Sequence, residues 1–211
     1  MTAFAELRAA PGVEEIVELR GAFGFMAYHG GALEAMTDVI AAEAARRSNA
    51  SLYAVVQPDG MREHLASTLV RPAESARLRS FVDHVDVVVT IHGFGQRGLF
   101  GSLLLGGRNR TLAAHVGRTL RRALPAYDIV TDLERIPPNL RGLHADNPVN
   151  LTPGCGVQIE LPPRVRGASP MWWDWEGPGL TPHTRALIEG LVDAALTWPA
   201  HGPDGSATAG G

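Results

Sequence analysis

The most hydrophobic run of the chain, Val85–Ile91, ends directly at His92 and Gly93. A run of this length and composition predicts a strand that is buried on both faces, as in a parallel sheet. Parallel strands need helical crossovers that cover the faces of the sheet. The run therefore favours an α/β fold and places His92 at the carboxyl end of a strand.

Strand-like and helix-like segments alternate along the rest of the chain. Strands are expected over residues 13–19, 23–28, 51–56, 99–105, 127–131 and 156–161, and helices over 33–47, 72–83, 110–124 and 182–196. Residues 65–70 fit either a strand or an extended loop, and residues 133–155 fit a long loop. The pattern predicts a single-domain, three-layer α/β sandwich over residues 1–200, with a mixed, mostly parallel sheet flanked by helices, and a disordered tail over 201–211.

A second histidine follows another expected strand, in the segment His29-Gly30-Gly31-Ala32-Leu33-Glu34. The two glycines allow a tight turn, and a helix is expected to begin near Leu33 with Glu34 in its first turn. Strands that end at His29 and His92 deliver both side chains to the carboxyl edge of the sheet, where open α/β sheets bind ligands. Two histidines and one glutamate are the protein ligands of a catalytic zinc site that leaves one position to water. His29, Glu34 and His92 are therefore candidate metal ligands.

The spacing of these residues excludes a simpler arrangement. His29 and Glu34 are five residues apart, so on one helix their side chains would point ~140° apart and could not share a metal ion. A strand, a turn and a helix start bring them together instead. The alternative interpretation is that both histidines are ordinary polar residues in glycine-rich turns.

Hydrolysis at such a metal ion also needs a group that moves protons. Glu160 is the only acidic residue between Asp146 and Asp174, and it lies near the end of an apolar segment. It is the best candidate for a general base. The alternative is a carboxylate that faces solvent at a strand end.

The charge of the chain is unevenly distributed. All nineteen basic residues are arginine, and the net charge is −3. Residues 87–166 contain ten arginines against five acidic residues. A local positive field around a crevice attracts an acidic substrate, although several of these arginines also fit the solvated face of a helix. The negative total charge and the lack of a nucleic-acid motif argue against nucleic-acid binding.

The sequence also bears on localisation. No stretch approaches 18 apolar residues, so neither a transmembrane helix nor a membrane partner is expected. The amino terminus lacks a basic segment followed by an apolar run, so no signal peptide is expected. The lone Cys155 cannot form an internal disulfide. These features favour cytoplasmic synthesis, with release by lysis as an open alternative, and they leave the oligomeric state undetermined.

An ordered set of short motifs resembles the phage-related poly-γ-glutamate hydrolase family. The set consists of His29–Glu34, Ser51–Tyr53, Ile91–Gly93, Gly106–Gly107, Asn147–Asn150, Gly156–Glu160 and Arg166, and it spans roughly residues 20–166. The resemblance implies a zinc-dependent enzyme that cuts γ-glutamyl amide bonds in poly-γ-glutamate, with an α/β fold similar to the zinc carboxypeptidases. His64 corresponds only loosely to a family segment, Leu-His-x-x-Ser, and the Trp-rich carboxyl third has no counterpart in the resemblance.

The resemblance implies a role for each candidate residue. His29, Glu34 and His92 become the ligands of Zn²⁺, and Glu160 becomes the general base. Asn150 and Arg166 match polar positions that fit substrate binding. Arg108 is a further candidate, because an arginine can stabilise the oxyanion that forms during amide hydrolysis.

Two alternative functions stay open at this point. The same site could serve an amidase or carboxypeptidase that acts on peptidoglycan peptides, which also contain γ-glutamyl bonds. The chain could instead be a non-catalytic protein that binds an acidic polymer. A closed zinc site with four protein ligands would favour that second alternative, and the sequence offers no obvious fourth ligand.

Overall fold

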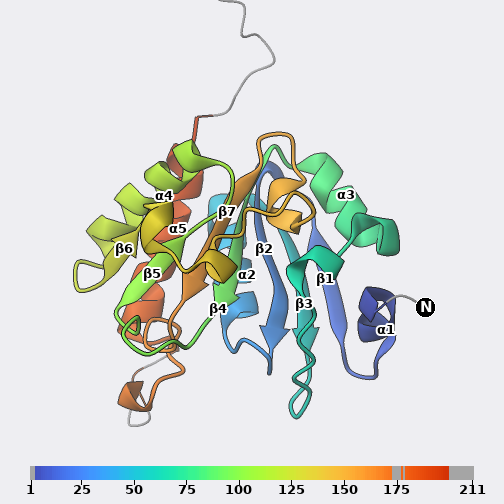
Figure 1. Ribbon diagram of the computed structural model, residues 1–211, viewed down its shortest axis with the longest axis horizontal. Coiled ribbons are helices and arrows are strands. Elements are labelled where there is room, and N and C mark those ends of the chain that lie inside the picture. The colour runs from blue at the N-terminus through green and yellow to red at the C-terminus, as the bar shows by residue number, and fades with distance from the viewer. Residues whose placement is uncertain (1–2, 173–176, 178, 200–211) are drawn as a thin grey trace, which may run out of the picture.

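The computed structural model describes residues 3–172, 177 and 179–199, and its centre is a seven-stranded sheet. From edge to edge, the strand order is β1-β3-β2-β4-β7-β5-β6 (Figure 1). The strands are β1 (Glu14–Glu18), β2 (Gly21–Gly31), β3 (Ala50–Gln57), β4 (Val87–Gly93), β5 (Ser102–Leu105), β6 (Asp128–Val130) and β7 (Gly156–Leu161).

The four central strands of the sheet are parallel, and an antiparallel pairing occurs on either side of them. Neighbouring pairs among β3, β2, β4 and β7 are parallel. At one side β1 pairs antiparallel with β3, and at the other β5 pairs antiparallel with β7 and parallel with β6. Central β4 is buried from Val87 to His92. The expected mixed, mostly parallel sheet is confirmed, with the hydrophobic run at its centre.

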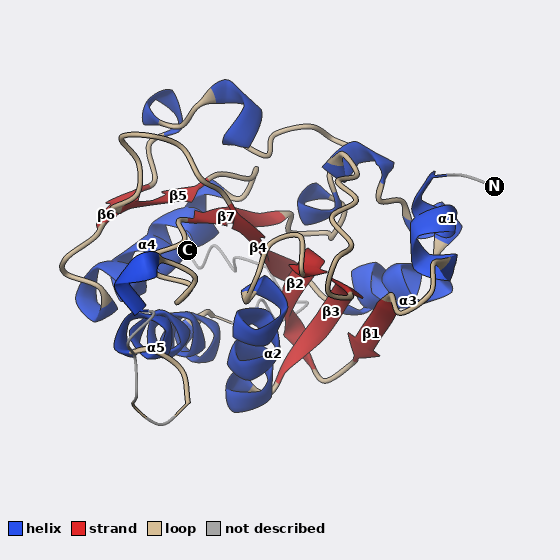
Figure 2. Ribbon diagram, turned by 90° about the horizontal axis from the view of Figure 1, so that it is seen from below, coloured by secondary structure: helices blue, strands red, loops and turns tan. Residues whose placement is uncertain are grey.

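Helices cover the sheet on both faces. Three of them, α2, α4 and α5, lie together on one face (Figure 2). Helix α3 packs near β1 and β3 on the opposite face. The α-helices among the described residues are α1 (Ala3–Ala9), α2 (Thr37–Ser48), α3 (Ala76–His84), α4 (Arg110–Ala123) and α5 (Pro182–Thr197).

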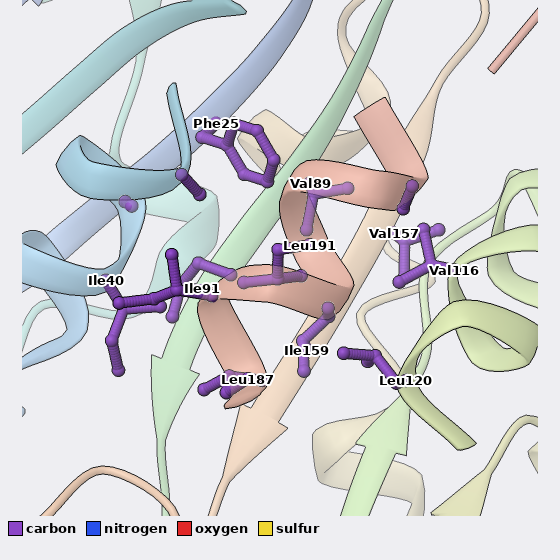
Figure 3. Close-up of a cluster of buried hydrophobic side chains, with 14 of the residues drawn as sticks. Phe25, Ile40, Val89, Ile91, Val116, Leu120, Val157, Ile159, Leu187 and Leu191 are labelled. Carbon is purple, nitrogen blue, oxygen red and sulfur yellow. The ribbon is translucent and has the colours of Figure 1, made fainter. Parts of the chain in front are cut away.

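Alternate residues of the central strands face two separate hydrophobic cores. Phe25 of β2 and Val89 of β4 pack with Leu191 of α5 on the face covered by α2, α4 and α5 (Figure 3). Met26 of β2 points the other way and packs with Phe81 of α3. Each such side chain contributes roughly 1.5–3 kcal/mol by burial. Because side chains alternate along a strand, the two cores fix which residues at the strand ends face the candidate site.

The expected helices differ from the observed ones at two of their starts. The helix expected from residue 33 begins at Thr37, because Met36 adopts a left-handed φ of 75° that a helix does not accommodate. The helix expected over 72–83 is a 3-10 turn followed by α3. Ser75 separates the two, and its side chain caps α3 by accepting a hydrogen bond from the backbone N–H of Leu78.

Other segments complete the comparison. Residues 65–70 contain a 3-10 turn rather than a strand, and α1 was not expected from the sequence. The long loop over 133–155 contains three short 3-10 turns. The tail expected over 201–211 lies outside the described residues. None of the helices described here is long and apolar enough to cross a bilayer.

Candidate metal centre

Two neighbouring strands bring the expected histidines to one edge of the sheet. His29 lies near the carboxyl end of β2 and His92 near that of β4, and these strands are parallel neighbours (Figure 1). Both side chains are almost fully buried. Their ring centroids are 5.0 Å apart. The two histidines are therefore neighbours in space, as the strand ends predicted.

A tight turn after β2 brings Glu34 beside His29. Gly31 has a φ of 71°, and a β-carbon at this position would come within 2.1 Å of the carbonyl oxygen of Gln57, so glycine is required there. The backbone N–H of Glu34 donates to the carbonyl oxygen of His29 at 3.0 Å. Glu34 thus belongs to the turn that precedes α2, not to the first turn of the helix, which corrects the expected helix start.

The three candidate ligands converge on the Glu34 carboxylate. Its Oε1 is 2.9 Å from Nδ1 of His29, and its Oε2 is 3.3 Å from Nδ1 of His92. One ligand atom from each residue lies within 4.8 Å of the others, and no second group of this kind occurs in the part of the chain that the structure describes. Two imidazole nitrogens and one carboxylate oxygen form the donor set of a catalytic zinc site.

The far nitrogen of each imidazole is held by a partner outside the ligand group. Nε2 of His29 is 2.9 Å from the carbonyl oxygen of Leu65, and Nε2 of His92 is 3.0 Å from the hydroxyl of Tyr28. A carbonyl oxygen only accepts, so Nε2 of His29 donates to Leu65, and Nδ1 is the ring nitrogen that faces Glu34 and is left for a metal ion. Partners of this kind orient metal-binding histidines. The residues present therefore fit a metal ion bound by both Nδ1 atoms.

The Glu34 carboxylate is stabilised as an anion. Burial alone would raise its pKa, but the neighbouring imidazoles of His92 and His29 outweigh burial and lower the pKa below its usual range. The backbone N–H of Gly93 also donates to Oε2 of Glu34 at 2.8 Å. An ionised carboxylate is the form that binds a metal ion.

Glu160 lies on the next strand along the sheet. It pairs in register with His92 across the parallel strands β4 and β7. Its side chain is buried, and Oε1 accepts a hydrogen bond of 2.8 Å from Nε2 of Gln158. Burial raises the pKa of Glu160. The structure therefore places a buried carboxylate beside the three candidate ligands.

Arg166 reaches the same edge of the sheet from the segment after β7. Its Nε donates to the carbonyl oxygen of Leu161 at 3.1 Å, and its Nη1 donates to that of Ala35. The guanidinium lies against Gly93. Burial lowers the pKa of Arg166, while the charges of Glu34 and Glu160 oppose this shift. The arginine stays a cation in this setting.

Arg108 and Asn150 lie at the opposite end of β7 from Glu160. Because β5 runs antiparallel to β7, the residues after β5 reach the start of β7 at Gly156. The backbone N–H of Arg108 donates to Oδ1 of Asn150 at 3.1 Å, and Nδ2 of Asn150 donates to two carbonyl oxygens of the 133–155 loop. The structure does not bring these two residues to the candidate ligands. Their role in substrate binding stays a prediction.

Sequence reasoning missed two residues of the site and set a third aside. Tyr28 and Gln158 contact His92 and Glu160, respectively. Gln158 precedes Glu160 by two residues, so strand periodicity could have placed both side chains on one face. His64, which corresponded only loosely to a family segment, is exposed, and its ring centroid lies 5.1 Å from that of His29.

Comparison with known proteins identifies the family. A model of the poly-gamma-glutamate hydrolase family matches residues 3–171, which include all the candidate site residues. The chain belongs to the poly-gamma-glutamate hydrolase family. This match confirms the family expected from the motifs and, with it, the expectation of a hydrolase that acts on poly-γ-glutamate.

Solved structures confirm the fold. A bacteriophage poly-gamma-glutamate hydrolase is 20% identical, with a TM-score of 0.72 over 90% of this chain and 91% of that chain. YndL in its zinc-free form is 19% identical, with a TM-score of 0.68 over 86% of this chain and 88% of that chain. A putative carboxypeptidase from Burkholderia mallei is 11% identical, with a TM-score of 0.50 over 90% of this chain and 64% of that chain. No curated protein matches the sequence. The expected carboxypeptidase-like α/β fold is confirmed.

Proposed function

We propose that the chain is a zinc-dependent hydrolase of the γ-glutamyl amide bonds of poly-γ-glutamate. In this proposal His29, Glu34 and His92 hold Zn²⁺, and Glu160 is the general base. The strongest support is the convergence of two Nδ1 atoms on one carboxylate, in a chain of this family. The zinc-free form of the similar YndL structure also supports zinc as the metal.

The proposed chemistry assigns proton transfer to Glu160. A zinc ion at this site supplies a Lewis acid and lowers the pKa of a water molecule toward ~7. Glu160 takes a proton from the attacking water as the C–O bond forms at the γ-amide carbon. When the C–N bond breaks, Glu160 gives that proton to the leaving nitrogen, so a γ-carboxyl group and a free amine are released.

Arg166 is proposed to bind the anionic substrate. Its buried guanidinium lies at the same sheet edge as Glu34 and Glu160 and suits a carboxylate of the polymer or the developing oxyanion. Arg108 and Asn150 lie at the far end of β7. Any contact that they make with the polymer is therefore away from the bond that is cut.

The decisive test is which amide linkage the protein cuts, the γ-linkage or the α-linkage of polyglutamate. The purified, zinc-supplemented chain is incubated with poly-γ-glutamate and, separately, with poly-α-glutamate, which carries the same charge on a different amide linkage. Size-exclusion chromatography then measures polymer length. The proposal predicts that only poly-γ-glutamate is shortened.

Other outcomes would assign another function. Cleavage of peptidoglycan γ-glutamyl peptides without shortening of poly-γ-glutamate would contradict the proposed substrate. Binding of poly-γ-glutamate without any cleavage, at full zinc occupancy, would contradict an enzymatic role.

A further inference from the structure

A chain of buried hydrogen bonds begins at the candidate ligand His92. Nε2 of His92 is 3.0 Å from the hydroxyl oxygen of Tyr28. The Tyr28 hydroxyl in turn donates to Oδ1 of Asn147 over 3.3 Å. Asn147 comes from the 133–155 loop, 119 residues away from Tyr28 in sequence. The loop thus contacts the candidate metal centre through the side chain of one asparagine.

The same chain continues to the candidate base. Nδ2 of Asn147 donates to Oε1 of Gln158 over 2.9 Å, and Nε2 of Gln158 donates to Oε1 of Glu160 over 2.8 Å. The exposed fractions of the five side chains from His92 to Glu160 lie between 1% and 5%. A candidate ligand and the candidate base are therefore joined by three intermediate side chains that are shielded from solvent.

Two backbone groups fix the direction of this chain. The N–H of Val149 lies 3.2 Å from Oδ1 of Asn147, and an N–H can only donate, so the oxygen of the Asn147 amide must face it. The amide nitrogen of Asn147 then faces Gln158. The carbonyl oxygen of Leu140, which can only accept, lies 3.4 Å from Nε2 of Gln158 and requires the nitrogen of that amide at this end. Both amide orientations thus follow from the backbone.

The direction has consequences at both ends. Because the Tyr28 hydroxyl donates to Asn147, its oxygen accepts from Nε2 of His92, which must carry a proton. Nδ1 of His92 is then the ring nitrogen that faces Glu34 and is left for a metal ion. At the other end, Gln158 donates to Oε1 of Glu160, and no described residue hydrogen-bonds the other oxygen, Oε2.

We propose that Gln158 is a positioning residue for the hydrolysis, acting within the chain His92–Tyr28–Asn147–Gln158–Glu160. It holds Glu160 so that Oε2 stays available for the attacking water, and through Asn147 and Tyr28 it keeps His92 in the tautomer that binds metal at Nδ1. This inference rests on the proposed function, because it assigns Gln158 a part in the same reaction.

The surroundings of Gln158 support a fixed orientation. Gly142 of the loop has a φ of 62°, and a β-carbon there would come within 2.6 Å of Oε1 of Gln158. Thr90 is the register partner of Gln158 on β4, yet its buried hydroxyl has no hydrogen-bond partner among the described residues. Thr90 is thus a buried polar neighbour of Gln158 that takes no part in the hydrogen-bond chain. It therefore offers a matched control.

The test compares three variants of the full-length chain. Gln158→Met removes the hydrogen bonds to Asn147, Glu160 and the Leu140 carbonyl at similar volume, and Gln158→Glu keeps only the acceptor for Asn147. Thr90→Val removes a neighbouring hydroxyl that makes no bond. At saturating zinc, we expect kcat on poly-γ-glutamate to fall about 10- to 100-fold in both Gln158 variants, with KM unchanged. Thr90→Val should keep the kcat of the unmodified chain.

Circular dichroism and the melting temperature establish that each variant is folded. Equal kcat values in folded Gln158→Met, folded Thr90→Val and the unmodified chain would overturn the inference. An unmodified chain that does not cut the polymer would instead contradict the proposed function itself.

A second measurement tests the hydrogen bonds between His92, Tyr28 and Asn147 without substrate. Nitrogen-15 NMR of the full-length chain reports which ring nitrogen of His92 carries the proton, and competition with a chelator reports zinc affinity. We expect Nε2 of His92 to be protonated, and Tyr28→Phe to weaken zinc binding about 10- to 100-fold. An Nε2 of His92 that carries no proton, or unchanged zinc affinity in Tyr28→Phe, would overturn the proposed link to His92.

Discussion

The guanidinium of Arg166 lies so close to Gly93 that a β-carbon at position 93 would come within 2.8 Å of Cζ of Arg166. The three nearest atoms all belong to the end of the Arg166 side chain, not to the backbone. An alanine at position 93 can therefore be accommodated by moving the guanidinium. The absence of a side chain at Gly93 thus leaves the space that the guanidinium of Arg166 occupies.

Gly93→Ala should reduce activity more than stability. Displacement of the Arg166 guanidinium should lower kcat/KM on poly-γ-glutamate by about 10- to 100-fold, because small misplacements of binding groups have effects of this order. The melting temperature should fall only modestly, although Arg166 also donates to two backbone carbonyls. Kinetics and thermal unfolding on the same preparation check the prediction, and a large fall in the melting temperature with kcat/KM unchanged would contradict it.

Glu160→Gln should separate metal binding from turnover. The substitution keeps the size of the side chain but removes the group that is proposed to accept and return a proton. We expect kcat to fall by roughly 10²–10⁴-fold, the usual contribution of general acid–base catalysis. Zinc content, measured by elemental analysis, should remain that of the unmodified chain. A variant that retains its turnover would remove Glu160 from the mechanism.

Glu34→Gln should weaken metal binding. Glu34 bridges the two histidines and supplies the only carboxylate of the candidate ligand group. Loss of its charge should lower zinc affinity at least about tenfold, as measured by competition with a chelator. Glu43→Gln on the surface of α2 is the control, because Glu43 forms its ion pair with Arg46 outside the site. Equal zinc affinities for the two variants would exclude Glu34 as a ligand.

Gly107→Ala should destabilise the fold. Gly107 has a φ of 84°, and a β-carbon there would come within 2.3 Å of the carbonyl oxygen of Gly156, which is backbone and cannot rotate away. Gly60 is the control, because it has a φ of 87° and no atom near its β-carbon position. Gly60→Ala should cost only about 1–2 kcal/mol for the left-handed conformation. Denaturant unfolding should show a clearly larger loss for Gly107→Ala, and equal losses would contradict the backbone clash.

Much of the fold follows from local sequence patterns. The hydrophobic run ending at His92 predicted the central strand, and the helix expected from residue 110 is α4, which Asn109 caps by accepting from the backbone N–H of Leu112. The start of α2 did not follow. It depends on the left-handed φ of Met36, a conformation that its residue type does not signal.

The residues of the site that lie at strand ends could be predicted from the sequence. Those whose position depends on pairing between distant segments could not. Two histidines at the ends of parallel strands, with a glutamate after a glycine turn, were sufficient to predict that these three side chains converge. The antiparallel pairing of β5 with β7, which places Arg108 far from Glu160, could not be read from the segment itself. The link between Tyr28 and Asn147 joins residues 119 positions apart, and such contacts leave no periodic pattern in a single sequence.

The most direct test of the account is whether shortening of poly-γ-glutamate depends on zinc held by this chain. Polymer length is measured after incubation with the purified chain as prepared, after metal removal by a chelator, and after zinc is added back. The account predicts shortening that stops on metal removal and returns with zinc, and that does not return in Glu34→Gln at the same low zinc concentration. Continued shortening by the metal-free chain would contradict a catalytic role for the site formed by His29, Glu34 and His92.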